Sequence, residues 1–160
     1  MNAEHLRDYL IVPTLEYLSP EIQVTPAAVE LVLGTALQES HLEFLRQLGE
    51  GPALGLWQCE PATHDDVWDN YLAFQALLAS KIRGLASQHL WQQDRHGELV
   101  RNLAYACGIC RVHYRRVREP LPAAGDTYAQ AVYWKRYYNT ERGAGTVSDY
   151  VQAWQRQAGG

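Results

Sequence analysis

The fold of this chain is set by residues 25–40, TPAAVELVLGTALQES. Thr25 is a favourable N-cap and Pro26 suits the first helical position, so we expect a helix to begin here. Val29, Leu33 and Leu37 recur at helical spacing, which predicts a buried helix that ends near Ser40. Gly34 within it suggests close packing or a local cost of about 1 kcal/mol.

The segments on either side of this helix are also expected to be helical. Helical spacing over about 2–18 is interrupted by Pro13, which should kink or divide the helix, and Ser19-Pro20 marks a turn. We expect further helices from Pro61, over 74–92, 98–118 and 126–139, and a last one from Thr146, where Thr146 and Asp149 resemble a capping box.

Between these helices, residues 43–60 contain Gly49, Gly51, Pro52 and Gly55 and lose the helical period. We expect a loop or a short irregular hairpin there. The chain is therefore predicted to be a mainly α single domain over 1–160, with six or seven helices and one short Gly-rich hairpin. Strands and helices do not alternate, so a parallel-sheet enzyme is excluded.

Composition and charge narrow the function classes. The net charge of −4 argues against a nucleic-acid partner. Arg111, Arg115, Arg116 and Arg118 form a local basic cluster, which we interpret as a solvated helix face. No apolar run approaches the length of a membrane span, and MNAEHLRDYLIVPTLEYL (1–18) lacks the regions of a signal peptide. We expect a protein made in a cytoplasm and not exported by the usual signal.

The three cysteines, Cys59, Cys107 and Cys110, do not suggest a disulfide framework. Cys107-Gly-Ile-Cys110 has CxxC spacing but no βαβ setting, and the six histidines are scattered without metal-ligand spacing. We predict buried thiols on a helix, and neither a metal nor a cofactor.

Glu39 is the candidate catalytic residue. It lies at the end of an apolar helix, where apolar walls and the negative end of the helix dipole both raise the pKa of a carboxyl group. A glutamic acid that stays protonated near neutral pH can act as a general acid. The alternative is an exposed glutamate at a fraying helix end.

Three short motifs follow in order: Glu39-Ser40, then Gly55-Leu-Trp-Gln58 with Pro61-Ala-Thr63, then Ala104-Tyr-Ala-Cys-Gly-Ile-Cys-Arg-Val112. Over about residues 26–118 the chain resembles the soluble lytic transglycosylases and, more broadly, the goose-type lysozyme relatives. That resemblance implies a lysozyme-like fold and cleavage of the glycan strands of peptidoglycan.

The resemblance also implies roles for individual residues. Glu39 matches the catalytic acid, Ser40 the serine that helps to hold it, and Gly55 a glycine that lets the backbone approach the glycan. Gln58 matches a glutamine of the sugar groove and Tyr105 a tyrosine near the acid. The alternatives are a surface position for Gln58 and a core position for Tyr105.

A groove tyrosine is also implied on the helix over 126–139, where Tyr133, Tyr137 and Tyr138 are candidates and Tyr138 is taken as the site residue. The chain departs from the family pattern at three places. The gap between Glu39 and Gly55 is about one residue longer than usual, so the hairpin is expected to differ. Trp57 replaces a methionine and can add stacking surface. Ala106, Ile109 and Cys110 replace the asparagine, proline and glycine usual there, so the third motif is expected to continue as helix.

The reaction is left open between two types. A lytic transglycosylase needs one carboxyl group, whereas a hydrolase of the usual type needs two across the scissile bond. The candidates for the second are Glu50, Glu60, Asp65 and Asp66, with Glu50 favoured by position. We favour the lyase with Glu39 as acid and base. A third possibility is a structural or binding module.

The absence of a signal peptide, together with the expected compact single domain, suggests a bacteriophage setting. Phages need local wall degradation, and their virion proteins need no export signal. We expect a virion-associated protein that acts on the bacterial wall, with peptidoglycan and other virion proteins as partners. A stored endolysin explains the same features.

Overall fold

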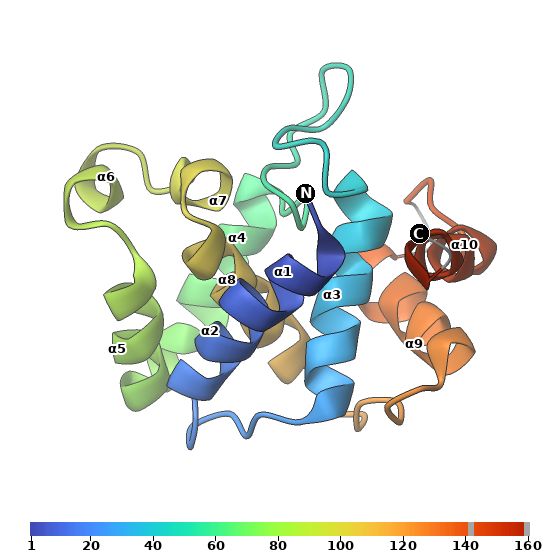
Figure 1. The fold of residues 1–160 in the computed structure, drawn as a ribbon. Coiled ribbons are helices and arrows are strands. Elements are labelled where there is room, and N and C mark those ends of the chain that lie inside the picture. Colours follow the sequence, from blue (N-terminus) through green and yellow to red (C-terminus); the bar gives the residue numbers. More distant parts are fainter. Residues whose placement is uncertain (141–142, 159–160) are drawn as a thin grey trace.

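The computed structural model describes residues 1–140 and 143–158 and is almost wholly helical there (Figure 1). The α-helices are α1 Ala3–Leu6, α2 Val12–Tyr17, α3 Pro26–Ser40, α4 Pro61–Asn70, α5 Ala76–Leu85, α6 Gln88–Gln93, α7 Glu98–Arg101, α8 Leu103–Arg115, α9 Thr127–Trp134 and α10 Val147–Ala158. Shorter turns are η1 Arg7–Ile11, η2 Leu72–Phe74 and η3 Lys135–Asn139. The mainly α prediction is confirmed.

Helix α3 is the central element, with α9 and α10 on one side and α4–α6 on the other (Figure 1). Its ends are those predicted from the sequence. The Oγ1 of Thr25 accepts a hydrogen bond from the backbone N–H of Ala28 at 3.1 Å. At the other end, His41 and Leu42 adopt left-handed backbone angles (φ of 52° and 58°), which stops the helix.

The chain holds more and shorter helices than the six or seven expected. The 74–92 and 98–118 helices are each divided, at Ala86-Ser87 and at Asn102, because Ser87 and Asn102 cap new helices through their side chains. The stretch over 2–18 is divided near Pro13, as predicted. A π turn (η1) separates α1 from α2, and Pro13 lies in the first turn of α2, where its missing N–H is tolerated.

The Gly-rich segment forms an irregular hairpin above the end of α3 (Figure 1). Isolated antiparallel bridges join Arg46 to Leu54 and Leu54 to Cys59. Gly55 has a φ of +79°, and a Cβ there would collide with the backbone carbonyl of Leu99. The hairpin is therefore held against α7 as well as α3.

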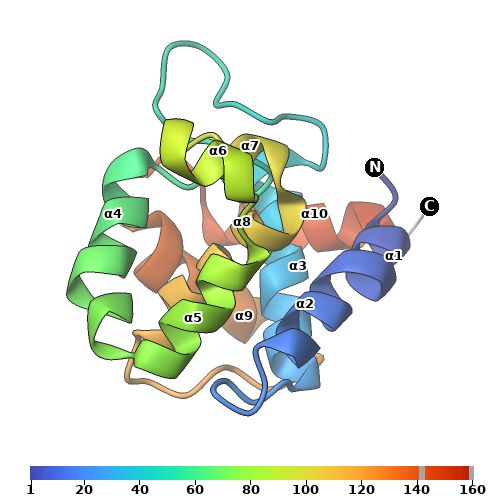
Figure 2. The same cartoon turned by 90° about the vertical axis from the view of Figure 1, so that its left-hand side faces the viewer.

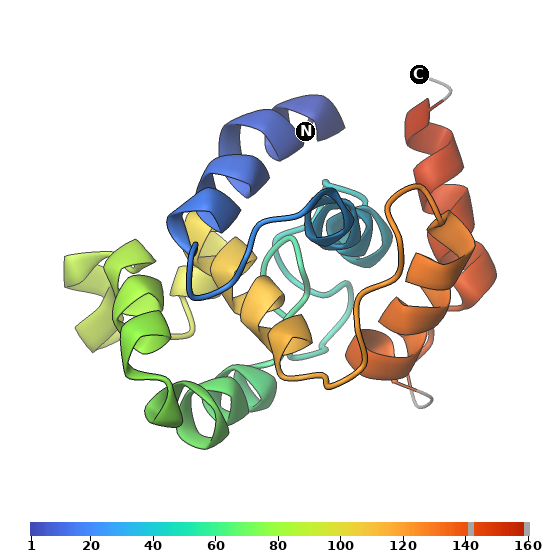
Figure 3. The same ribbon diagram turned by 90° about the horizontal axis from the view of Figure 1, so that it is seen from below.

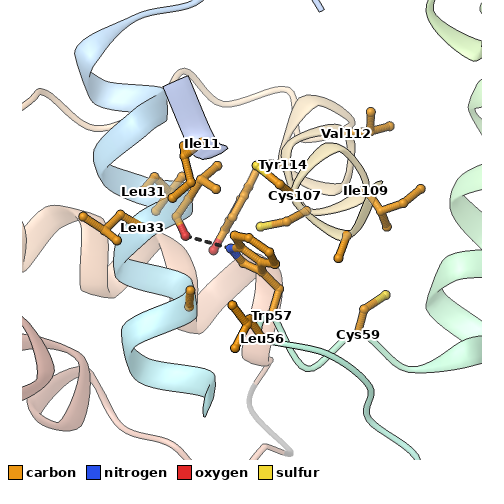
Figure 4. Close-up of a cluster of buried hydrophobic side chains, with 14 of the residues drawn as sticks. Ile11, Leu31, Leu33, Leu56, Trp57, Cys59, Cys107, Ile109, Val112 and Tyr114 are labelled. Atoms are coloured by element: carbon orange, nitrogen blue, oxygen red, sulfur yellow. Dashed lines mark hydrogen bonds between the residues drawn. The ribbon is translucent and has the colours of Figure 1, made fainter. Parts of the chain in front are cut away.

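The core lies mainly between α3 and α8, with α5 packed on the outside of α8 (Figures 2 and 4). Trp57 reaches into this core and donates from Nε1 to the carbonyl of Val32 at 2.9 Å. It is 1% exposed, so it supplies core packing and no stacking surface. Cys107 and Cys110 are buried free thiols on α8, as predicted, and Cys59 is a buried free thiol as well.

The last helix begins as predicted. The N–H of Asp149 donates to Thr146 Oγ1 at 3.1 Å, and the N–H of Thr146 donates to Asp149 Oδ2 at 2.9 Å. This reciprocal cap directs α10 back along α3. Within the described ranges, no helix combines the length and apolar character needed to cross a membrane.

Candidate active site

A groove of about 490 Å³ opens at the C-terminal end of α3. Four segments form its walls: the end of α3 with Glu39, the hairpin and the start of α4 over 44–63, His113 of α8, and residues 138–145 from the end of η3 onward. Of the last segment, 141 and 142 are outside the described residues. Glu39 is half-buried in this groove. The structure thus places a carboxyl group where a solute can reach it.

Trp134 of α9 holds the Glu39 carboxyl. Its indole Nε1 donates to Glu39 Oε1 at 2.9 Å, and the ring itself is fully buried. Burial raises the pKa of Glu39 to about 7, and this effect outweighs the hydrogen bond from Trp134, which favours the carboxylate. A carboxyl group with this pKa can both donate and accept a proton near neutral pH.

Two further polar groups flank the carboxyl. Asn139 and Lys135 both favour the ionised form of Glu39, and Lys135 is itself held by Asn139 Oδ1 at 2.7 Å and by the carbonyl of Gly143 at 3.0 Å. Beside Glu39, the buried Oε1 of Gln38 has no hydrogen-bond partner among the described residues. Gln38 also lines the groove.

Of the residues expected from the sequence, Gln58 and Tyr138 line the same groove as Glu39. Gln58 adopts a left-handed φ of 47°, and its Nε2 donates to the carbonyl of Gly55 at 2.8 Å. The Tyr138 hydroxyl donates to the carbonyl of Trp57 at 2.5 Å. Both side chains are therefore held in place before any ligand arrives.

An aromatic wall continues from Tyr138. The ring of His113 lies 4.8 Å from that of Tyr138, measured between centroids, and also lines the groove. Burial lowers the pKa of His113 to about 4, so its imidazole is neutral at pH 7. Its Nε2 then donates to the carbonyl of Tyr137 at 3.0 Å.

Ser40 and Gly55 are not among the groove-lining residues. The Ser40 hydroxyl donates to the carbonyl of Ala36 at 3.1 Å and accepts from the N–H of Leu42 at 3.3 Å. It thus closes the end of α3 and does not hold Glu39. Gly55 brings the backbone close to Leu99, and not to the groove, because the hairpin folds inward at this point.

Tyr105 is placed in the core, away from the groove. It is 0% exposed and faces α4, where its hydroxyl meets His64 Nε2 at 2.6 Å and accepts from Trp68 Nε1 at 2.8 Å. The cause is the uninterrupted α8, whose helical course after Asn102 turns this side chain toward α4. Continuous helix through Cys110 agrees with the prediction, whereas a groove role for Tyr105 does not fit this burial.

Glu60 is the second carboxyl group at the groove among the described residues. It precedes Pro61 and is exposed. Glu50, the favoured candidate, is not among the groove-lining residues. Asp65 and Asp66 are engaged elsewhere, with the two histidines His64 and His96 and with Arg116 respectively.

The only group of three potential metal ligands within the described ranges is His64, Asp65 and His96, whose donor atoms lie within 4.8 Å of one another. Asp65 Oδ1 is 3.1 Å from His64 Nδ1 and 2.8 Å from His96 Nε2. Because Tyr105 already meets the other nitrogen of His64, these residues form a continuous hydrogen-bonded chain. Sequence spacing gave no sign of this cluster, since 31 residues separate Asp65 from His96.

Several groove residues were missed by sequence reasoning. Gln38, His113 and Asn139 line the groove, whereas Trp134 is buried behind it and donates to Glu39. The Tyr- and Trp-rich character of 126–139 was the only signal for Trp134 and Asn139, and it singled out neither; no motif pointed to Gln38 or His113. No protein-family model, curated protein or solved structure matches the chain.

Proposed function

We propose that the protein is a lysozyme-like lytic transglycosylase that cleaves the glycan strands of peptidoglycan, with Glu39 as its general acid and base. The observation that carries this proposal is the half-buried Glu39 carboxyl in an open groove, with its pKa raised to about 7. The order of the motifs through Gln58 supports the same function. Ser40, Gly55 and Tyr105 contribute packing and not contacts with the sugar.

The proposed reaction begins with Glu39 protonated. Its O–H donates the proton to the glycosidic oxygen as the bond to muramic acid C1 breaks, and the substrate's acetamido group stabilises the cationic centre. The Glu39 carboxylate then removes the proton of the muramic acid 6-hydroxyl while O6 bonds to C1. The enzyme ends in its starting state, and the product carries a 1,6-anhydro ring.

The surroundings of Glu39 suit both steps. Trp134 donates a hydrogen bond to one oxygen of the carboxyl group, and the side chain of Asn139 is a second hydrogen-bond partner. Because the pKa lies near neutrality, neither the acid form nor the base form is strongly disfavoured. Gln58, Gln38 and Tyr138 supply polar and aromatic surface for the sugar rings.

Hydrolysis is the second candidate. Glu60 lines the groove and Glu50 does not, so Glu60 is the better candidate for the second carboxyl group that hydrolysis needs. In that reaction Glu60 would activate a water molecule while Glu39 donates its proton. Mass spectrometry of digested peptidoglycan separates the two reactions, because anhydro-muropeptides identify the lyase and reducing ends identify the hydrolase.

The decisive comparison uses the wild type, Glu39→Gln and Glu60→Gln, with Glu50→Gln as a matched control on the hairpin. We expect anhydro products from all except Glu39→Gln. Reducing ends that disappear in Glu60→Gln would favour hydrolysis. An active Glu39→Gln would refute the central assignment, and inactivity of every folded protein would favour a structural or binding module.

We also propose a bacteriophage setting, in which the protein is carried in the virion. Immunodetection of the chain in purified particles tests this. Accumulation only as free protein at lysis would instead identify a stored endolysin.

A further inference from the structure

A second pocket lies at the opposite end of α3 from Glu39. It has a volume of about 480 Å³ and is formed by the α2–α3 connection, the first turn of α3 and one face of α8. Figure 3 shows the connection passing α8 on its way into α3. The 13 residues of helix between Pro26 and Glu39 correspond to roughly 20 Å, so the two sites are separate.

Arg111 is the notable residue of this pocket. The expectation of a solvated helix face is wrong here, because Arg111 is only 6% exposed. It forms no ion pair or hydrogen bond with any described residue, and its Nε is buried without a partner. A buried guanidinium without a counter-charge is costly, and burial accordingly lowers the pKa of Arg111.

The other donors of the pocket converge with Arg111. Arg115, one turn further along α8, lines the same space and is exposed. The first turn of α3 supplies Ala27, whose backbone N–H has no acceptor within the described ranges, and Thr25, whose hydroxyl proton is not engaged in any described hydrogen bond. The N-terminus of the 15-residue helix α3, the positive end of its dipole, adds to the positive potential of the pocket.

One acidic group also lines the pocket. Glu21 would oppose an anion, but it is paired with Lys81, whose Nζ lies 2.6 Å from its Oε2. Pro20, Ile22 and Leu121 provide apolar walls, and Ile22 is buried. Charge-assisted hydrogen bonds are strengthened where water is excluded by such walls.

We propose that this pocket binds a phosphate-type oxyanion, held by Arg111, Arg115 and the first turn of α3. Two guanidinium groups on α8 and the amide of Ala27 on α3 approach from different helices, which suits a tetrahedral anion with several acceptor oxygens. The anion would supply the counter-charge that Arg111 lacks. This site is independent of the proposed glycan groove.

A ¹⁵N NMR titration with inorganic phosphate at pH 7 tests the proposal, with ionic strength held constant by NaCl. We expect saturable shifts of the Ala27 amide. Arg115→Gln should weaken binding about tenfold, since it removes a charge-assisted contact. Arg118→Gln, the same charge change at an exposed position outside the pocket, should leave the affinity within about twofold.

Arg111→Gln should abolish the saturable shifts. If Arg111→Gln does not fold, the test rests on Arg115→Gln. Shifts that do not saturate, or equal affinity in the Arg115 and Arg118 variants, would overturn the proposal. A parallel titration with glycerol 3-phosphate identifies the source of the ligand. Binding of both compounds indicates a phosphate on a larger molecule, binding of inorganic phosphate alone indicates the free anion, and binding of neither overturns the site.

Discussion

Two glutamates in this molecule are removed from bulk water, and their hydrogen bonding differs. Glu98 of α7 is 0% exposed. Its Oε1 accepts from the N–H of Ser87 at 2.9 Å and from the Ser87 hydroxyl at 2.6 Å, and its Oε2 accepts from Asn102 Nδ2 at 2.8 Å. Glu39 is half-buried and accepts from Trp134 Nε1 at 2.9 Å, with the side chain of Asn139 as its other hydrogen-bond partner.

The comparison separates a structural carboxylate from one available for chemistry. Both oxygens of Glu98 are used to join the caps of α6 and α8, so no oxygen is left for a ligand. Glu39 has one oxygen fixed and lies in a groove, where burial raises its pKa to about 7. Glu39 thus differs from Glu98 in lying at the groove and in having fewer hydrogen-bond partners.

The largest expected effect is on catalysis by Glu39→Gln. Loss of the proton donor should lower kcat/KM on purified peptidoglycan by about 10²–10⁴-fold. Glutamine keeps an acceptor for Trp134, so folding should be preserved. The matched control is Glu16→Gln, an exposed position on α2, which should act like the wild type.

Glu98→Gln should lower the free energy of unfolding and leave catalysis almost unchanged. The amide nitrogen of glutamine would place a donor against the donors of Ser87 and Asn102, at a cost of about 2 kcal/mol. Urea denaturation measures this loss, and activity per folded molecule should stay within about twofold. A drop in kcat/KM of the size expected for Glu39→Gln would contradict the division between the two glutamates.

The stability of the wild type should depend on pH through Glu39. Below its ordinary pKa of 4.5 the carboxyl is protonated in both folded and unfolded chains. Between pH 4.5 and about 7 the unfolded chain ionises first, so the wild type loses up to about 3 kcal/mol relative to Glu39→Gln. Urea denaturation of both proteins at pH 4, 6 and 8 should show that the difference between their free energies of unfolding grows as the pH rises. A difference in unfolding free energy that stays constant with pH would argue against the raised pKa of Glu39.

The smallest effect is expected from Trp134→Phe. Removal of the indole donor should raise the pKa of Glu39 further, because that hydrogen bond favours the carboxylate. The fall of kcat/KM above pH 7 should therefore move to higher pH, with less than about tenfold loss at the optimum. Trp68→Phe, which removes the donor to Tyr105, should lower stability without moving this profile.

Much of the helical order could be predicted because its signals are local. Thr25 and Pro26 begin α3, and Thr146 with Asp149 begins α10, through hydrogen bonds within one turn. The breaks at Ser87 and Asn102 were missed because these residue types also occur within helices. What makes them caps is their shared attachment to Glu98, a contact that spans the boundary between helices.

The candidate site was predicted unevenly for the same reason. Gln58 and Tyr138 line the groove with Glu39, whereas Ser40, Gly55 and Tyr105 serve the packing of the chain. The order of motifs predicts where a residue lies along the chain, but it does not predict the direction of its side chain. That direction depends on the helix that covers it.

Local chemistry in the sequence thus determines where helices begin and end, and it places a glutamate at the exposed end of an apolar helix. Whether that carboxyl is solvated, ion-paired or held with a raised pKa depends on Trp134, 95 residues away, and on the hairpin that forms one wall of the groove. Likewise, the burial of Arg111 follows from the packing of α8 and not from the basic run in which it lies. Helix formation depends on neighbours within a turn, while burial and pKa depend on segments that only tertiary packing brings together.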